Sequence, residues 1–249
     1  MIEVFVFILG TVVFSFGGVC IDRIPKGESV ISGRSKCDCC GNVIKWYDLV
    51  PVLSYLFLKG KCRNCGSKIP VYCIVVEIIG GIVSLLCYFV HGLSVNYVLS
   101  LMICFMLVVI GFIDQFTMDI YTNTIVVLGM FCAVYRLVNG IDILDMCLSI
   151  FVISGLLFIM LMVFKGSFGF GDVELMLVSG MFLSFGQMLL AFFIGVITAG
   201  VSALFLIAIK TKGGKDHIAF GPYLVIGILI SYFFGFNIIG WYLGILVVL

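Results

Sequence analysis

Two aspartates stand at the ends of long apolar runs, where a carboxylate is unusual. Asp114 ends the run Tyr97–Ile113, and Asp172 closes the segment Gly169-Phe170-Gly171-Asp172 just before another apolar run. An ionised aspartate at bilayer depth costs roughly 3 kcal/mol on insertion scales, so its presence there suggests a function. Two carboxylates about 3 Å apart cannot both be ionised. The charged one can then take a proton from water while the neutral one hydrogen-bonds a carbonyl, which is the chemistry of hydrolysis.

Each aspartate also has a purely structural interpretation. Asp114 can be a solvated helix end, and Asp172 can be an N-cap or first-turn acid stabilised by the helix dipole. Gly169 and Gly171 favour the catalytic interpretation, because a glycine-rich turn lets the chain pass close to a neighbouring helix or a bound peptide. Asp119, five residues after Asp114, is expected to be a solvated loop acid.

The elements that carry the aspartates have the composition of a membrane protein. The chain is 63% hydrophobic and only 11% charged, outside the range of soluble domains. Its apolar stretches are long enough to cross a bilayer and lack the alternation of a barrel. These features predict an all-α polytopic membrane protein with about eight transmembrane helices. The expected spans are Val4–Gly18, Tyr72–Val90, Tyr97–Ile113, Thr124–Tyr135, Met146–Phe164, Val173–Leu183, Met188–Ile209 and Pro222–Phe234. The apolar tail Ile238–Leu249 is too short to cross alone, so it is either a ninth partial segment or an extension of the eighth.

The distribution of basic residues predicts the orientation of these spans. Of the 14 lysines and arginines, nine lie between Arg23 and Lys68, in the hydrophilic insert after the first span. Four more follow the fifth and seventh spans, and only Arg136 falls on the other side. The positive-inside rule then places the basic loops, and with them both aspartates, at the cytoplasmic face. Because cytoplasmic loops of polytopic proteins are basic in general, no nucleic-acid partner is expected.

The hydrophilic insert (22–70), which separates the first span (1–21) from the remaining bundle (71–249), carries two C-x-x-C motifs. Cys37 and Cys40 form the first, Cys62 and Cys65 the second, and 21 residues separate them, as in four-thiolate zinc sites. A small insert without an adequate hydrophobic core needs a bound metal of this kind to stabilise its fold. The alternatives are disulfides, which a reducing cytoplasm disfavours, and unliganded thiols. Cys39 complicates the first motif, because it can substitute for a neighbour.

Further motifs run through nearly the whole chain. They are Phe16-Gly17-Gly18-Val19, Asp22-Arg23-Ile24-Pro25-Lys26-Gly27-Glu28-Ser29, Val50-Pro51-Val52-Leu53-Ser54-Tyr55-Leu56, Lys59-Gly60-Lys61-Cys62-Arg63, Ile113-Asp114 and Phe220-Gly221-Pro222. With the cysteine pairs and the Gly-x-Gly-Asp segment, they resemble the signatures of the type IV prepilin leader peptidases. These are polytopic aspartyl proteases of the bacterial inner membrane.

The resemblance implies a reaction and roles for individual residues. Members of the family cut the short basic leader from prepilins and pseudopilins after a glycine, on the cytoplasmic side. Many then methylate the new N-terminal amine with S-adenosylmethionine. Asp114 and Asp172 correspond to the two catalytic aspartates, while Gly169, Phe170, Gly171, Phe220, Gly221 and Pro222 are expected to shape the site. Glu77 matches a family glutamate that lines the site or binds the methyl donor, although a helix–helix hydrogen bond explains it equally well.

Three positions depart from the family pattern. Ile120-Tyr121-Thr122 stands where a Leu-Pro-Asp-like segment is usual, Glu174 where lysine is frequent, and Asp38 where proline is common. Aspartates in membrane helices are also compatible with two other functions. A proton-coupled transporter would use the aspartates as a relay, but it predicts an inverted repeat and helices broken at mid-depth, which the sequence lacks. A non-catalytic scaffold for pilus assembly would leave the aspartates inert.

Overall fold

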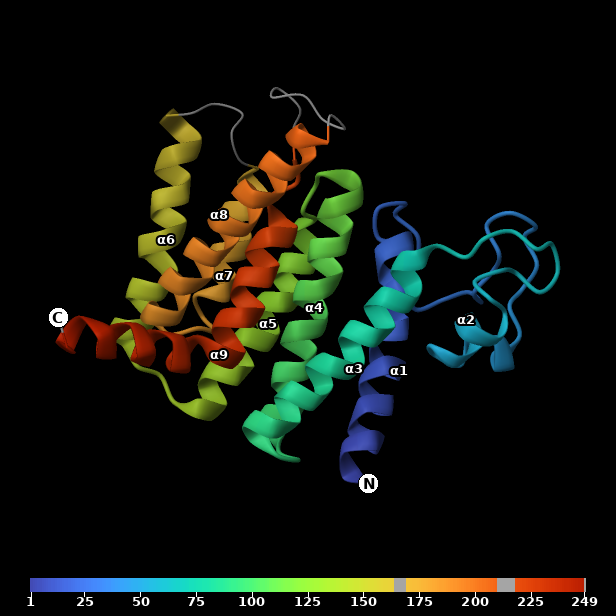
Figure 1. Ribbon diagram of the computed structural model, residues 1–249, viewed down its shortest axis with the longest axis horizontal. Helices are drawn as coiled ribbons and strands as arrows, with labels where there is room; N and C mark the ends of the chain where they lie inside the picture. Colours follow the sequence, from blue (N-terminus) through green and yellow to red (C-terminus); the bar gives the residue numbers. More distant parts are fainter. Residues whose placement is uncertain (164–168, 210–217, 249) are drawn as a thin grey trace. The chain divides into compact units, whose positions relative to one another are not determined.

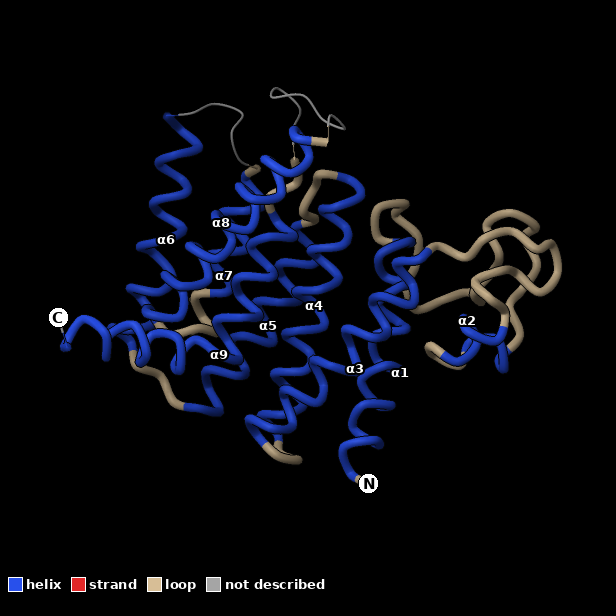
Figure 2. The backbone as a smooth tube through the Cα atoms, in the orientation of Figure 1, coloured by secondary structure: helices blue, strands red, loops and turns tan. Residues whose placement is uncertain are grey.

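The computed structural model describes residues 1–163, 169–209 and 218–248. Helices, turns and loops make up these ranges, and no strand occurs within them (Figure 2). The elements are α1 (Ile2–Arg23), a 3-10 turn η1 (Trp46–Leu49), α2 (Leu53–Phe57), α3 (Val71–His91), α4 (Val95–Thr117), α5 (Thr122–Asn139), α6 (Ile143–Val163), α7 (Phe170–Ser179), α8 (Phe185–Ala208) and α9 (Gly221–Val248) (Figure 1). The basic residues expected in the later cytoplasmic loops, Lys165, Lys210, Lys212 and Lys215, lie outside the described ranges.

Seven of the described helices are long and apolar enough to cross a membrane: α1, α3, α4, α5, α6, α8 and the stretch Gly221–Gly244 of α9. The predicted all-α polytopic class is thereby confirmed. The expected span Val173–Leu183 is instead the ten-residue helix α7. At 1.5 Å per residue α7 is about 15 Å long, half the thickness of the hydrocarbon core. The apolar tail is an extension of the last helix, because α9 continues to Val248.

The chain folds as two compact units, residues 1–97 and 98–249. In the first unit, α1 and α3 pack closely because glycines face the contact. A Cβ on Gly80 would overlap the side chain of Phe14, and one on Gly10 would overlap the carbonyl of Gly80. Small residues allow backbones to approach in this way when there is no hydrophobic force between helices in lipid.

One carboxylate makes hydrogen bonds both to α1 and to the insert. Glu77 on α3 accepts a hydrogen bond from the Ser15 hydroxyl of α1 with one oxygen, at 2.7 Å. Its other oxygen accepts the backbone N–H of Val52 in the insert, also at 2.7 Å. Val52 has φ of 62°, a backbone conformation that β-branched residues rarely adopt. Glu77 therefore joins α1, α3 and the insert, and holds the insert in a conformation that local propensity disfavours.

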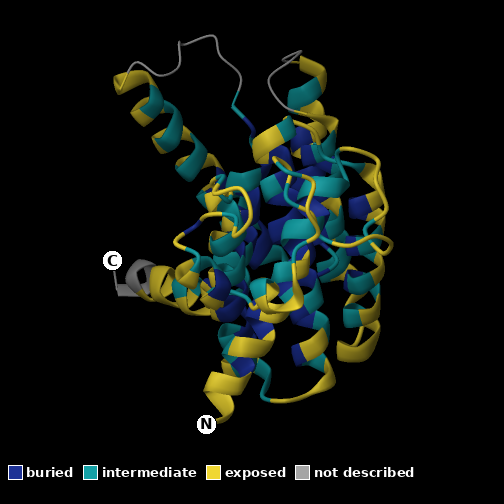
Figure 3. Ribbon diagram, turned by 90° about the vertical axis from the view of Figure 1, so that its right-hand side faces the viewer, coloured by how far each residue is buried: buried dark blue, intermediate teal, exposed yellow. Residues whose placement is uncertain are grey.

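In the second unit α4 is the most enclosed helix. Its span is 72% buried, against 11% to 33% for the spans of α5, α6, α8 and α9. Figure 3 marks each described residue as buried, intermediate or exposed along the ribbon. Of these spans, α4, which carries Asp114, is therefore the least exposed.

An ion pair ties three helices of this unit together. The Arg136 guanidinium at the end of α5 lies 3.0 Å from the Asp145 carboxylate near the start of α6. The second Asp145 oxygen accepts the backbone N–H of Phe185, the first residue of α8, at 2.9 Å. Arg136 is the basic residue that the charge distribution places on the outer side, and its partner in the structure is Asp145.

Candidate active site

Asp114 lies in the last turns of α4, and its carboxylate is held by the start of α9. It is 5% exposed, and its Oδ2 accepts the backbone N–H of Gly221 at 2.9 Å. That N–H belongs to the first turn of α9, where backbone donors have no partner within the helix. A Cβ on Gly221 would lie 2.5 Å from Asp114 Oδ2, so glycine is needed for this close approach.

Asp172 occupies the first turn of α7 and is also 5% exposed. Its Oδ2 accepts the backbone N–H of Gly169 at 3.0 Å, while its own N–H donates to the Gly169 carbonyl. Asp172 therefore closes the start of its helix, as the capping interpretation proposed. Its burial, like that of Asp114, excludes a solvated helix terminus.

The contact between Gly171 and Ile120 brings the start of α7 against the segment that follows α4. A Cβ on Gly171 would lie 2.6 Å from the Cβ of Ile120, so the position has no room for a side chain. Gly169 differs, because a Cβ there would meet Asp172 Oδ2 at 3.5 Å, an ordinary contact. The Asp172 carboxylate lies within electrostatic range of the Asp114 carboxylate.

The two carboxylates are held in the same way. Each uses one oxygen, Oδ2, to accept a glycine N–H at a helix N-terminus, where the helix dipole favours negative charge. Within the part of the chain that the structure describes, the Oδ1 of each accepts no hydrogen bond. One oxygen of each acid is therefore available to a water molecule or a substrate.

Of the other residues expected to shape the site, Phe220, Pro222 and Phe170 lie near the two acids in the chain or at Gly221, whereas Glu77 lies in the first unit. Phe220 and Pro222 adjoin Gly221, and the second position of α9 suits proline because its missing N–H is not needed there. Phe170 is 58% exposed beside Asp172. Glu77 belongs to the first unit, where it makes the helix–helix hydrogen bond that was one of its interpretations. In the sequence, Ile120 stands out only because it departs from the family pattern, and no residue pattern predicts its contact with Gly171.

The four cysteines of the insert form a cluster that fits a tetrahedral metal site. The sulfur atoms of Cys37, Cys40, Cys62 and Cys65 all lie within 4.8 Å of one another, and Cys37 and Cys65 are 3.8 Å apart. Zinc–sulfur bonds of about 2.3 Å in tetrahedral geometry separate the sulfurs by about 3.8 Å. Cys39 is exposed and lies outside the cluster, and all eleven cysteines are free thiols. The predicted zinc-binding insert is thereby supported over the disulfide alternative.

Local geometry explains why two short motifs build this cluster. In each motif a glycine with positive φ follows the second cysteine, Gly41 at 69° and Gly66 at 71°. The turn is closed by the first cysteine's N–H, from Cys37 to the Asn42 carbonyl and likewise in the second motif. The backbone around Cys40 lowers the pKa of the Cys37 thiol, which favours the thiolate that metals bind.

Fold and site together define a polytopic helical membrane protein with a buried carboxylate pair in one unit and a four-cysteine insert in the other. Residues 8–91 match the bacterial peptidase A24 N-terminal domain, and residues 101–204 match the type IV leader peptidase family. The two matched regions cover most of the chain. The chain belongs to the type IV leader peptidase family, which makes it a peptidase.

Relatives from several bacteria carry one name, prepilin leader peptidase/N-methyltransferase. The protein of Bacillus subtilis is 26% identical over 239 residues, 95% of this chain and 96% of its own length. That of Legionella pneumophila is 28% identical over 85% of this chain and 76% of its own length. That of Myxococcus xanthus is 39% identical over 114 residues, 46% of this chain and 34% of its own length. No solved structure matches the chain significantly.

Proposed function

We propose that the protein is an aspartyl endopeptidase that removes the basic leader from type IV prepilins or pseudopilins. The reaction takes place at the cytoplasmic face of the bacterial inner membrane, with Asp114 and Asp172 as the catalytic pair. One observation carries the proposal. Two buried carboxylates of the same unit are each held through one oxygen by a helix N-terminus and keep the other oxygen available. The names of the relatives supply the substrate class.

The chemistry follows from the shared proton of two neighbouring acids. The ionised carboxylate takes a proton from a water molecule, whose oxygen attacks the carbonyl carbon of the peptide bond. The protonated carboxylate donates a hydrogen bond to the carbonyl oxygen and so stabilises the charge that develops there. Gly221 and Gly169 N–H groups keep both acids in position during these transfers. Holding the reacting groups in place in this way lowers the entropic part of the barrier.

Two further assignments accompany the peptidase. The relatives' name joins peptidase with N-methyltransferase, so we infer that the new N-terminal amine is methylated with S-adenosylmethionine. The four-cysteine cluster is assigned to a structural zinc ion, because its sulfur separations suit the tetrahedral geometry of that metal. When bound, zinc would hold the two C-x-x-C motifs together in an insert that is too small to form a hydrophobic core of its own.

The test replaces each acid separately, with Asp114→Asn and Asp172→Asn measured on a prepilin in membranes. Either change is expected to lower the cleavage rate by at least about 1,000-fold, because the pair acts as a unit. Asp119→Asn is the matched control, since Asp119 is an exposed acid only five residues from Asp114. It should cleave within about threefold of wild type. Cleavage at the wild-type rate by either of the first two variants would remove that residue from the catalytic pair.

A further inference from the structure

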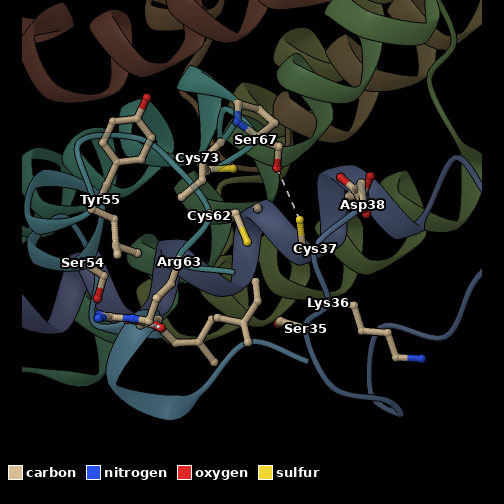
Figure 4. Close-up of a pocket in the computed structure, with 18 of the residues that line it drawn as sticks. Ser35, Lys36, Cys37, Asp38, Ser54, Tyr55, Cys62, Arg63, Ser67 and Cys73 are labelled. Carbon is tan, nitrogen blue, oxygen red and sulfur yellow. Dashed lines mark hydrogen bonds and ion pairs between the residues drawn. The ribbon is translucent and has the colours of Figure 1, made fainter. Parts of the chain in front are cut away.

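The short helix α2 of the insert has an apolar face that the rest of the described chain leaves uncovered. Leu53, Leu56 and Phe57 share this face, because they follow one another at the i, i+3 and i+4 positions of a helix. All three are exposed, Phe57 to 82%. On the other side of α2, Ser54 and Tyr55 line a cavity that the insert shares with α1 and α3 (Figure 4). The helix is therefore packed on one face and bare and apolar on the other.

The 3-10 turn η1 adds an aromatic side chain to this exposed region. Trp46, its first residue, is 77% exposed. The Ser54 hydroxyl of α2 donates a hydrogen bond to the backbone carbonyl of Tyr47 at 3.0 Å, which holds η1 against α2. The four exposed side chains Trp46, Leu53, Leu56 and Phe57 are called the docking surface below. Exposed apolar patches of this kind mark sites that bind a protein or a membrane.

The position of α2 along the membrane helices indicates which of these it binds. Glu77, which accepts the N–H of Val52 at the start of α2, lies six residues into α3, about 9 Å from its first residue at 1.5 Å per residue. Ser15, which donates to the same carboxylate, lies eight residues before the end of α1, about 12 Å. Both helices are apolar spans over these stretches. The start of α2 thus lies alongside the spans rather than beyond their ends, as Figure 1 also shows.

The charges around the docking surface suit a negatively charged partner. Lys45 precedes Trp46, and Lys59 and Lys61 follow Phe57 closely, all three of them exposed. The one acid between these lysines, Asp48, is already paired with Arg63 at 2.6 Å. Tryptophan is enriched at the level of lipid headgroups, and basic residues beside apolar ones are attracted to anionic lipids.

We propose that the docking surface inserts into the bilayer beside α1 and α3, at the boundary between acyl chains and headgroups. Lys45, Lys59 and Lys61 then contact the phosphate groups of anionic phospholipids. This inference needs only the membrane spans of the first unit, so it is independent of the proposed peptidase and methyltransferase activities. Its consequence is that the lipid surface, together with Glu77, fixes the insert against the membrane.

The test measures the contact between Trp46 and lipid by fluorescence. The chain contains two tryptophans, so Trp241→Phe leaves Trp46 as the single one. The full-length variant is reconstituted in vesicles of phosphatidylcholine and phosphatidylglycerol, with and without bromine on the acyl chains, which quenches tryptophan on contact. The matched control carries Trp46→Phe, Trp241→Phe and Glu28→Trp. Its tryptophan occupies an exposed position just after α1, where the N–H of residue 28 bonds to the Arg23 carbonyl.

Trp46 is expected to be quenched at least about twofold more strongly than the control tryptophan and to emit at shorter wavelength, because it lies deeper in the interface. Omitting phosphatidylglycerol should reduce the quenching of Trp46, and Lys59→Gln combined with Lys61→Gln should remove most of that difference. Identical quenching of Trp46 in both lipid mixtures would overturn the assignment to anionic lipid.

Three results would overturn the membrane assignment itself. The first is equal quenching of Trp46 and the control tryptophan by brominated lipid. The second is a Trp46 emission that brominated lipid leaves unchanged and that shifts only when a prepilin is added, which would assign the docking surface to the substrate. The third is an emission shift that appears only as the protein is concentrated in the vesicles, which would assign it to a second copy of the chain.

Discussion

The contact between Gly221 and Asp114 predicts that one added methyl group will inactivate the peptidase. In Gly221→Ala the new Cβ would lie 2.5 Å from Asp114 Oδ2 and 3.1 Å from its carboxyl carbon. Ordinary contacts begin at about 3.4 Å, so the carboxylate must move by about 0.9 Å. The hydrogen bond from the Gly221 N–H, now 2.9 Å long, would be lost in that movement.

The size of the effect follows from this displacement. A misplacement of about 1 Å in a reacting group can cost about 100-fold in rate, equivalent to about 2.7 kcal/mol in the activation barrier. The fold should survive, because the atom displaced is the end of a side chain rather than backbone. Alanine is also the better helix former, by up to about 1 kcal/mol. We therefore expect normal accumulation of protein with cleavage reduced by about 100-fold.

The assay is the initial rate of prepilin cleavage in membranes, normalised to the amount of enzyme. Gly111→Ala is the matched control, since it adds the same methyl group to the same α4–α9 contact, one turn before Asp114 on α4. There the nearest atoms are those of Val225 at 3.4 Å, which is an ordinary contact. The control should retain at least a third of the wild-type rate. Equal cleavage rates for Gly221→Ala and Gly111→Ala would refute the assignment of Gly221 as the residue that positions Asp114.

Two further predictions concern the other glycine contact and the cysteine cluster. Gly171→Ala should lower cleavage at least tenfold, because its Cβ would lie 2.6 Å from Ile120 Cβ, and Ile120→Gly in the same chain, which removes that Cβ, should restore part of the rate. Gly169→Ala should cleave within about threefold of wild type, because its nearest contact is 3.5 Å. Purified wild-type protein should contain about one zinc ion per chain by elemental analysis. Cys65→Ser should lose that zinc while Cys39→Ser, which changes a cysteine outside the cluster, should retain it.

Each of these predictions has an outcome that contradicts it. If Gly171→Ala and Gly169→Ala cleave equally well, the close approach to Ile120 has no role in positioning Asp172. If the double variant cleaves no better than Gly171→Ala, the loss has a cause other than this contact. A folded, active protein without metal would remove zinc from the insert, and equal zinc content in the two cysteine variants would assign the metal to a different ligand set.

Some features of the molecule could be inferred from residue patterns that act locally. Apolar runs long enough for a bilayer predict membrane helices wherever they occur, since the hydrocarbon core imposes the same length on every span. The two C-x-x-C motifs predict the cysteine cluster because each is a complete turn in itself, closed by its own backbone bonds and a following glycine. The boundaries of these elements were less certain. The expected eleven-residue span Val173–Leu183 ends at Ser179 as a helix, and its apolar composition could not reveal this.

The arrangement of the acids depends on contacts between residues that are far apart in the chain. Asp114 and Gly221 are separated by 107 positions, and nothing in either segment specifies that one donates a backbone N–H to the other. The same is true of Glu77, whose partners Ser15 and Val52 decided between its alternative roles. Such contacts follow from how helices pack, and packing depends on the shapes of all the side chains at the contact together.

Sequence by itself thus determined the membrane class, the four cysteines that form the cluster and the two acids that merit a chemical role. Each of these rests on a period, a spacing or a charge that is complete within one segment. Tertiary structure alone decided that both acids are buried, that glycine N–H groups hold one oxygen of each, and that Glu77 holds the start of α2 beside α3. The physical reason is that burial and close approach arise between segments, where only the folded chain brings the atoms within reach of one another.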